Sequence, residues 1–176
     1  VMRLQRWWTG ACLLAFAGSA MAADQCPSLQ GRQADPEVAT RIAAVACAEH
    51  LRWRRPFIDP AGRLASSVVA EGESRGLDDG GAPWRRVATY WRDAGLLGRT
   101  VAVGASDCVH AAGNASYPGL GCRGFVIDSP WSAAFVSWVM QRAGVPGFSH
   151  SGGHFEYVRA ARLAPLPVML NGGIGT

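Results

Sequence analysis

The chain has 176 residues, of which 49% are hydrophobic and 17% are charged, so it can build a buried core, and a disordered tail or a coiled coil is excluded. This length favours one domain, while the 22 glycines and 10 prolines favour short elements joined by many turns. The formal net charge is +4, but basic and acidic residues alternate along the chain, so no stripe of positive charge indicates a nucleic-acid partner.

The first 22 residues have the pattern of a secretory signal peptide. Arg3 and Arg6 make a positively charged start, residues 11–17 are an apolar run, and Ala20-Met-Ala22 is a small-x-small cleavage site. A membrane-spanning helix would need about 20 apolar residues, and this run is shorter. The sequence therefore predicts cleavage after Ala22, export to the periplasm or the extracellular space, and no membrane span in the mature chain.

Four cysteines remain after the signal peptide: Cys26, Cys47, Cys108 and Cys122. An even number in an oxidising compartment predicts disulfides, and no Cys-x-x-Cys spacing indicates zinc or redox chemistry. Three pairings exist. We predict Cys108 with Cys122, because the glycine-rich loop between them has little core of its own, and closing it would stabilise the fold by about 3 kcal/mol.

Apolar residues at helical spacing predict three helices in the first half of the mature chain. The first runs from Pro36 to Trp53, the second covers about 64–74, and the third begins at Pro83 and stops near Gly95. The tryptophans in these segments fit helix packing better than a cleft for a glycan or peptide.

A strand and a further helix are predicted around residue 130. Phe125-Val-Ile127 fits a short buried strand, and Asp128-Ser-Pro130 is a helix-start signal. The apolar stripe that follows, ended by Gly144, predicts a buried helix with Ser132 in its first turn. A helix start presents free N–H groups that suit an oxyanion, although Ser132 or Ser129 also fits a simple N-cap worth about 1 kcal/mol.

The block from Pro130 to Trp138, with Arg-Ala-Gly at 142–144, resembles the catalytic helix of the CHAP and NlpC/P60 cell-wall hydrolases, which carry Trp-Cys-Ala-Ala-Phe-Val or Asp-Cys-Ser-Gly-Phe-Val there. More closely, the chain resembles the bacterial family called domain of unknown function 2272, which has Ser in place of that Cys. The resemblance also takes in residues 49–53, 56–59, 84–91 and 154–157. It implies the α+β class: the helical half of a papain-like, NlpC/P60-type fold with a small or incomplete antiparallel sheet.

The chain departs from the papain-like pattern in its last third. Papain-like hydrolases carry the base His on a following sheet, in Gly-Asp-hydrophobic and Gly-His-hydrophobic contexts, and neither context occurs here. After Arg162 there is no His, Asp or Glu, which is expected of a truncated or frame-shifted product. We therefore divide the chain into a signal peptide (1–22), an N-terminal extension (23–40), a papain-like domain with an incomplete sheet (41–162) and a divergent tail (163–176).

Two histidines after the predicted helix are candidate bases, His150 and His154. Their spacing is that of two metal ligands on one helix face, but Gly152 and Gly153 disfavour a helix between them, so we predict neither a metal nor a cofactor. His154 is compatible with a helix cap or a surface position, and it is also compatible with a role in a functional site. Because the turn at 144–147 sends the chain back along the helix, we predict that His154 approaches Ser132.

Three hypotheses follow for the function. In the first, the protein hydrolyses peptide or amide bonds of the cell envelope, with Ser132 as nucleophile, His154 as general base, and Trp131 and Tyr157 binding substrate. In the second, it is a relative without catalysis that binds cell-wall peptide or glycan. In the third, it is an inactive structural remnant. The sequence indicates no oligomeric state.

Overall fold

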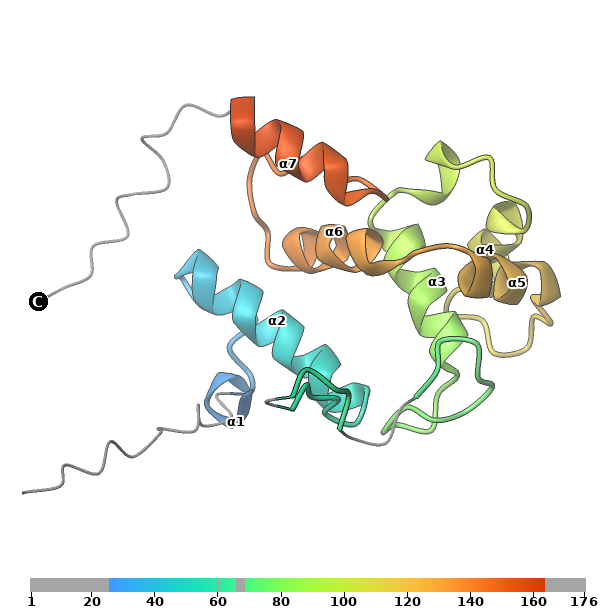
Figure 1. Ribbon diagram of the computed structural model, residues 1–176, viewed down its shortest axis with the longest axis horizontal. Helices are drawn as coiled ribbons and strands as arrows, with labels where there is room; N and C mark the ends of the chain where they lie inside the picture. The colour runs from blue at the N-terminus through green and yellow to red at the C-terminus, as the bar shows by residue number, and fades with distance from the viewer. Residues whose placement is uncertain (1–25, 60, 66–68, 164–176) are drawn as a thin grey trace, which may run out of the picture.

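The computed structural model describes residues 26–59, 61–65 and 69–163, and these residues form helices joined by turns (Figure 1). The predicted signal peptide and the tail beyond residue 163 lie outside the described residues. The helices are α1 (Cys26–Leu29), α2 (Val38–Arg52), α3 (Pro83–Asp93), the 3₁₀ turn η1 (Leu97–Arg99), α4 (Ala105–Ala111), α5 (Leu120–Asp128), α6 (Ser132–Arg142) and α7 (His154–Leu163).

The central helix is α3, which packs against α4, α5 and α6. Pro83 occupies its first turn, where a missing N–H costs no hydrogen bond. Trp84, Val87, Ala88 and Trp91 follow at steps of three and four residues, so they share one face, and all four are buried. The helix predicted from Pro83 is thereby confirmed.

The helix that begins at Ser132 is confirmed as well. It packs on both α2 and α3, and in Figure 1 α2 and α7 lie on opposite sides of it. Arg41 of α2 donates from Nε to the carbonyl oxygen of Ala143, 2.6 Å away, and so satisfies one of the free carbonyls at the end of α6. This bond helps to fix the position of α6 relative to α2.

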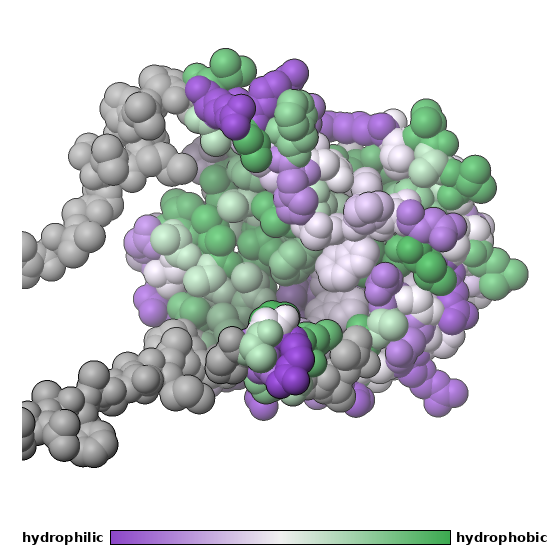
Figure 2. Space-filling model, in the orientation of Figure 1, coloured by the Kyte–Doolittle hydropathy of each residue, from purple (hydrophilic) through white to green (hydrophobic). Residues whose placement is uncertain are grey.

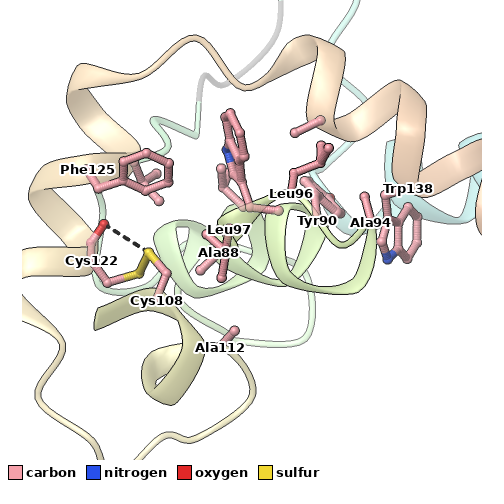
Figure 3. Packing of buried hydrophobic residues seen from close by; sticks show 14 of the residues in the cluster. Ala88, Tyr90, Ala94, Leu96, Leu97, Cys108, Ala112, Cys122, Phe125 and Trp138 are labelled. Atoms are coloured by element: carbon pink, nitrogen blue, oxygen red, sulfur yellow. Dashed lines mark hydrogen bonds between the residues drawn. A yellow bond between two sulfur atoms is a disulfide. The ribbon is translucent and has the colours of Figure 1, made fainter. Parts of the chain in front are cut away.

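Two disulfides tie neighbouring helices together. Cys108 with Cys122 joins α4 to α5, which confirms the predicted pair, and Cys26 with Cys47 joins α1 to α2. The first lies at one end of the core, and Trp138 of α6 lies at the other (Figure 3). Gly104, at the start of α4, has a positive φ, and a Cβ there would collide with the backbone of α5, so the close approach of the two helices requires glycine.

The expected α+β fold with a papain-like antiparallel sheet is wrong. Within the described ranges there is no sheet, and β pairing is limited to an isolated antiparallel bridge between Ile58 and Leu64. The strand expected at 125–127 is part of α5. Cys122, Phe125 and Val126 have helical spacing and are all buried, whereas Ile127 is exposed, so packing favoured the helix.

The helix expected at about 64–74 is also wrong for the residues described there. Leu64 makes the bridge to Ile58, and residues 65 and 69–74 form turns and irregular backbone. Arg123 donates from Nε to the carbonyl oxygen of Gly72, at 2.7 Å, and the backbone of Gly72 lies against the side chain of Ile127. These contacts hold the irregular segment against α5.

The surface over α7 differs from the surface beside it. Figure 2 shows mixed polar and apolar side chains over α7, and apolar surface where α2 and α6 lie next to each other. No residue of α7 is buried, and Phe155, Val158 and Leu163 are exposed. Among the described helices, none has both the length and the apolar character needed to cross a bilayer.

Candidate functional site

The Ser132 hydroxyl and the His154 ring meet where α6 and α7 both begin. Ser132 Oγ lies 2.8 Å from His154 Nε2, within hydrogen-bond distance. Both residues are exposed to solvent. When the ring proton is on Nδ1, Nε2 can accept the proton of the hydroxyl, which is the arrangement a general base requires.

The position of Ser132 at a helix start has a chemical consequence. It is the first residue of α6, and Trp131 before it makes no side-chain cap. The N–H groups of the first turn have no acceptor within the helix, and the positive end of the helix dipole lies there. A negative oxygen that develops next to Ser132 would be stabilised by these groups.

Among the described residues, His154 Nδ1 lacks the carboxylate partner that completes a catalytic triad. Within the part of the chain that the structure describes, no carboxylate hydrogen-bonds to His154 Nδ1. The ring is placed by Tyr157 instead, whose ring centre lies 5.8 Å away at an edge-on angle. Among the described residues, the site is therefore a serine–histidine pair without a third member.

Tyr157, predicted to bind substrate, ties α7 to α6 through its hydroxyl. That hydroxyl lies 2.6 Å from the carbonyl oxygens of Ala133 and of Ser151, and 2.7 Å from Ser137 Oγ. Ser137 is fully buried and accepts a hydrogen bond from the Ser151 backbone N–H at 2.9 Å. These contacts fix where α7 begins, and so where His154 lies.

Ser137 and Ser151 were not predicted from the sequence. Ser137 interrupts an apolar helix stripe, and a polar residue at a buried position usually has a hydrogen-bond partner. That signal could have identified it. His150, the other candidate base, lies away from Ser132: its Nδ1 is 3.1 Å from the carbonyl oxygen of Ser137.

Trp131 is held beside Ser132 by a chain of aromatic and polar contacts. Its ring stacks on Trp53, with ring centres 5.5 Å apart. Trp53 Nε1 donates to the Tyr90 hydroxyl at 2.8 Å, and that hydroxyl donates to the Glu49 carboxylate. Burial, together with the charge of Glu49, raises the pKa of Tyr90, which therefore stays neutral and able to donate.

An open groove of about 360 Å³ adjoins the serine, lined in part by Glu71, Asp128, Trp131 and Ser132. Glu71 comes from the irregular segment before α3, and the sequence carried no motif that placed it here. Among the described residues, no group of three or more His, Cys, Asp or Glu side chains is arranged to hold a metal ion.

Comparison with known families gives one match. Residues 78–166, about half of the chain, match the family described as "Uncharacterized protein conserved in bacteria (DUF2272)". The matched residues include α3, α6, α7 and both members of the serine–histidine pair. Neither the curated proteins nor the solved structures contain a match to the chain. The chain belongs to the bacterial family of domain of unknown function 2272.

Proposed function

We propose that this protein is an exported hydrolase of peptide or amide bonds in the bacterial cell envelope, with Ser132 as nucleophile and His154 as general base. The observation that carries the proposal is the distance of 2.8 Å between Ser132 Oγ and His154 Nε2. A serine hydroxyl is a weak nucleophile, so a base within hydrogen-bond reach is the first requirement for such chemistry.

The proposed reaction has two stages. Ser132 Oγ attacks the carbonyl carbon as His154 Nε2 takes its proton, and the resulting oxyanion faces the free N–H groups at the start of α6. The imidazolium then gives the proton to the leaving amine, which leaves an acyl ester on Ser132. A water molecule, deprotonated by His154, then attacks the ester; the acid is released, and the imidazolium returns the proton to Ser132 Oγ.

The likeness of the helix that carries Ser132 to the catalytic helix of the CHAP and NlpC/P60 enzymes supports the choice of cell-wall bonds. The proposal includes no papain-like sheet. Export is supported by the residue pattern before Ala22 and by the two disulfides, which form in oxidising compartments. The groove beside Ser132 gives a peptide access to the hydroxyl.

The test is turnover of peptidoglycan peptide fragments by the chain purified from the periplasm, with products separated by chromatography and identified by mass. We expect Ser132→Ala and His154→Gln each to lower the rate by roughly 10³-fold or more. Ser106→Ala, an exposed serine on α4, is the matched control and should leave the rate unchanged. Turnover that survives Ser132→Ala would refute the proposed nucleophile.

A second candidate function is binding of cell-wall peptide or glycan without turnover. Trp131, which lines the groove and is held by stacking on Trp53, favours it, because an aromatic ring fixed in this way offers a rigid apolar surface to a ligand. This function predicts that the fragments bind, that no product forms, and that Trp131→Ala weakens binding while Ser132→Ala does not.

A further inference from the structure

A second and larger cavity lies between α2, α3 and α6, and it shares no residue with the groove beside Ser132. Its volume is about 900 Å³, which is large enough for a short peptide. Its polar wall comes from all three helices and includes Glu49, Arg52, Arg86, Gln141 and Arg142.

The negative charge inside this cavity is already neutralised. Glu49 is only 3% exposed, and its carboxylate accepts hydrogen bonds from Arg86, at 2.8 Å from Nε, and has Arg52 Nε 3.5 Å away. Asp93, which also lines the cavity, is paired with Arg92. Both acidic residues of the lining therefore have an arginine partner, which weakens their repulsion of an anion.

Arg142 adds a positive charge that has no acidic partner among the described residues. Its guanidinium lies over Trp138, 5.8 Å from the ring centre, and Arg86 also lies over this ring, at 4.7 Å. The cavity therefore carries an uncompensated cation at its rim, where an incoming anion would meet it first.

A buried donor on the same wall lacks an acceptor. Trp138 is 5% exposed, and its Nε1 has no hydrogen-bond partner in the described part of the chain. A buried donor without an acceptor costs free energy, and a bound acceptor is one explanation for such a group. An oxygen acceptor with negative charge fits both this N–H and the free guanidinium.

We propose that this cavity binds the free terminal carboxylate of a short peptide. Arg142 is exposed, so its side chain can pair with the carboxylate at the rim, beside the Trp138 ring over which it lies. The amide side chains of Gln33 and Gln141, which also line the cavity, match the peptide groups of the ligand. This site is separate from Ser132 and does not depend on Ser132 being catalytic.

The experiment uses two probes that differ only in charge: N-acetyl-alanyl-alanine and its C-terminal amide. Each is titrated into ¹⁵N-labelled chain carrying Ser132→Ala, so that no hydrolysis can consume the probe, and the indole N–H resonance of Trp138 is followed by NMR. We expect the acid to shift this resonance with saturation, and the amide to bind at least about tenfold more weakly.

Arg142→Gln should weaken binding of the acid by about tenfold, to the level of the amide. Arg162→Gln, which removes an exposed arginine on α7 outside the cavity, is the matched control and should bind as the parent does. Equal shifts by acid and amide, the absence of any shift, or unchanged binding by Arg142→Gln would each overturn the proposal. Circular dichroism of each variant confirms that it is folded.

Discussion

Glu49 is the residue whose replacement should destabilise the helical core most directly. It is a buried carboxylate that binds the guanidinium of Arg86 through two of its N–H groups and accepts from the Tyr90 hydroxyl. Glu49→Gln keeps the size of the side chain and an acceptor for Tyr90, but it removes the charge opposite Arg86. The guanidinium is then left without a counter-ion in a largely buried position.

The expected loss can be worked out from these contacts. Two hydrogen bonds between charged groups contribute roughly 1.5–3 kcal/mol each, and breaking a buried ion pair from one side costs about 3–5 kcal/mol in total. The Arg86 side chain is 18% exposed, so water recovers part of this energy. We therefore expect a loss of about 3 kcal/mol, the lower end of the range, which is a large part of the roughly 5–15 kcal/mol that stabilises a typical domain.

The assay is urea unfolding followed by circular dichroism for Glu49→Gln, Arg86→Gln and the double variant. If the pair is the cause, the double variant should lose less than the sum of the two single losses, by about 1–3 kcal/mol. Glu156→Gln, in the exposed pair with Arg159 on α7, should leave the free energy of unfolding nearly unchanged. Additive losses, or a Glu49→Gln loss below about 1 kcal/mol, would refute the reasoning.

Three further predictions concern other contacts. Tyr157→Phe should speed amide hydrogen exchange in α7 by about fivefold, since a buried hydroxyl contributes roughly 1 kcal/mol, and unchanged exchange would contradict this. Replacing Cys108 and Cys122 together by Ala should lower the free energy of unfolding by about 3 kcal/mol in urea titrations. Equal urea midpoints for the variant and the parent would contradict this. Asp107 has its pKa lowered below 3.8, first by the hydrogen bond from the Tyr117 hydroxyl and then by that from the Cys122 N–H. Its carboxylate therefore stabilises the fold above pH 3.8, and this contribution is lost as the pH falls through the lower pKa of the folded state. Acid titrations of Asp107→Asn should accordingly show a smaller loss of stability below pH 4 than the parent, and an identical acid limb would argue against it.

The helices that could be predicted from the sequence are those whose signals lie within the helix itself. In α3, Pro83 and a regular apolar face agree, and in α6 the apolar stripe and Gly144 agree. At Phe125-Val-Ile127, three apolar residues in a row fit a strand or a helix equally well, and the contacts of α5 with α3 and α4 decide between them. The expected sheet came from a resemblance carried by residues 130–138 and by short blocks elsewhere, and none of these blocks holds a strand signal of its own.

The candidate site was predictable only in part, for a related reason. A serine at a helix start followed by a short return of the chain is visible in the sequence, so Ser132 and His154 were expected to approach each other. The contacts of Tyr157 with Ser137 and Ser151 depend on how far α7 is shifted along α6. The irregular segment at 143–153 sets that shift, and no spacing rule describes it.

The few contacts that hold α7 against α6 would allow the site to open. His154 sits on a helix that buries none of its residues, and in the described part of the chain the hydrogen bonds that join this helix to α6 are those of the Tyr157 hydroxyl and the Ser132–His154 contact itself. The serine–histidine pair can therefore separate while the core stays folded. A ligand that touches both helices would favour the closed arrangement of α6 and α7. Part of its binding free energy would go into closing the site, so its observed affinity would depend on the fraction of ligand-free molecules in which α7 is closed.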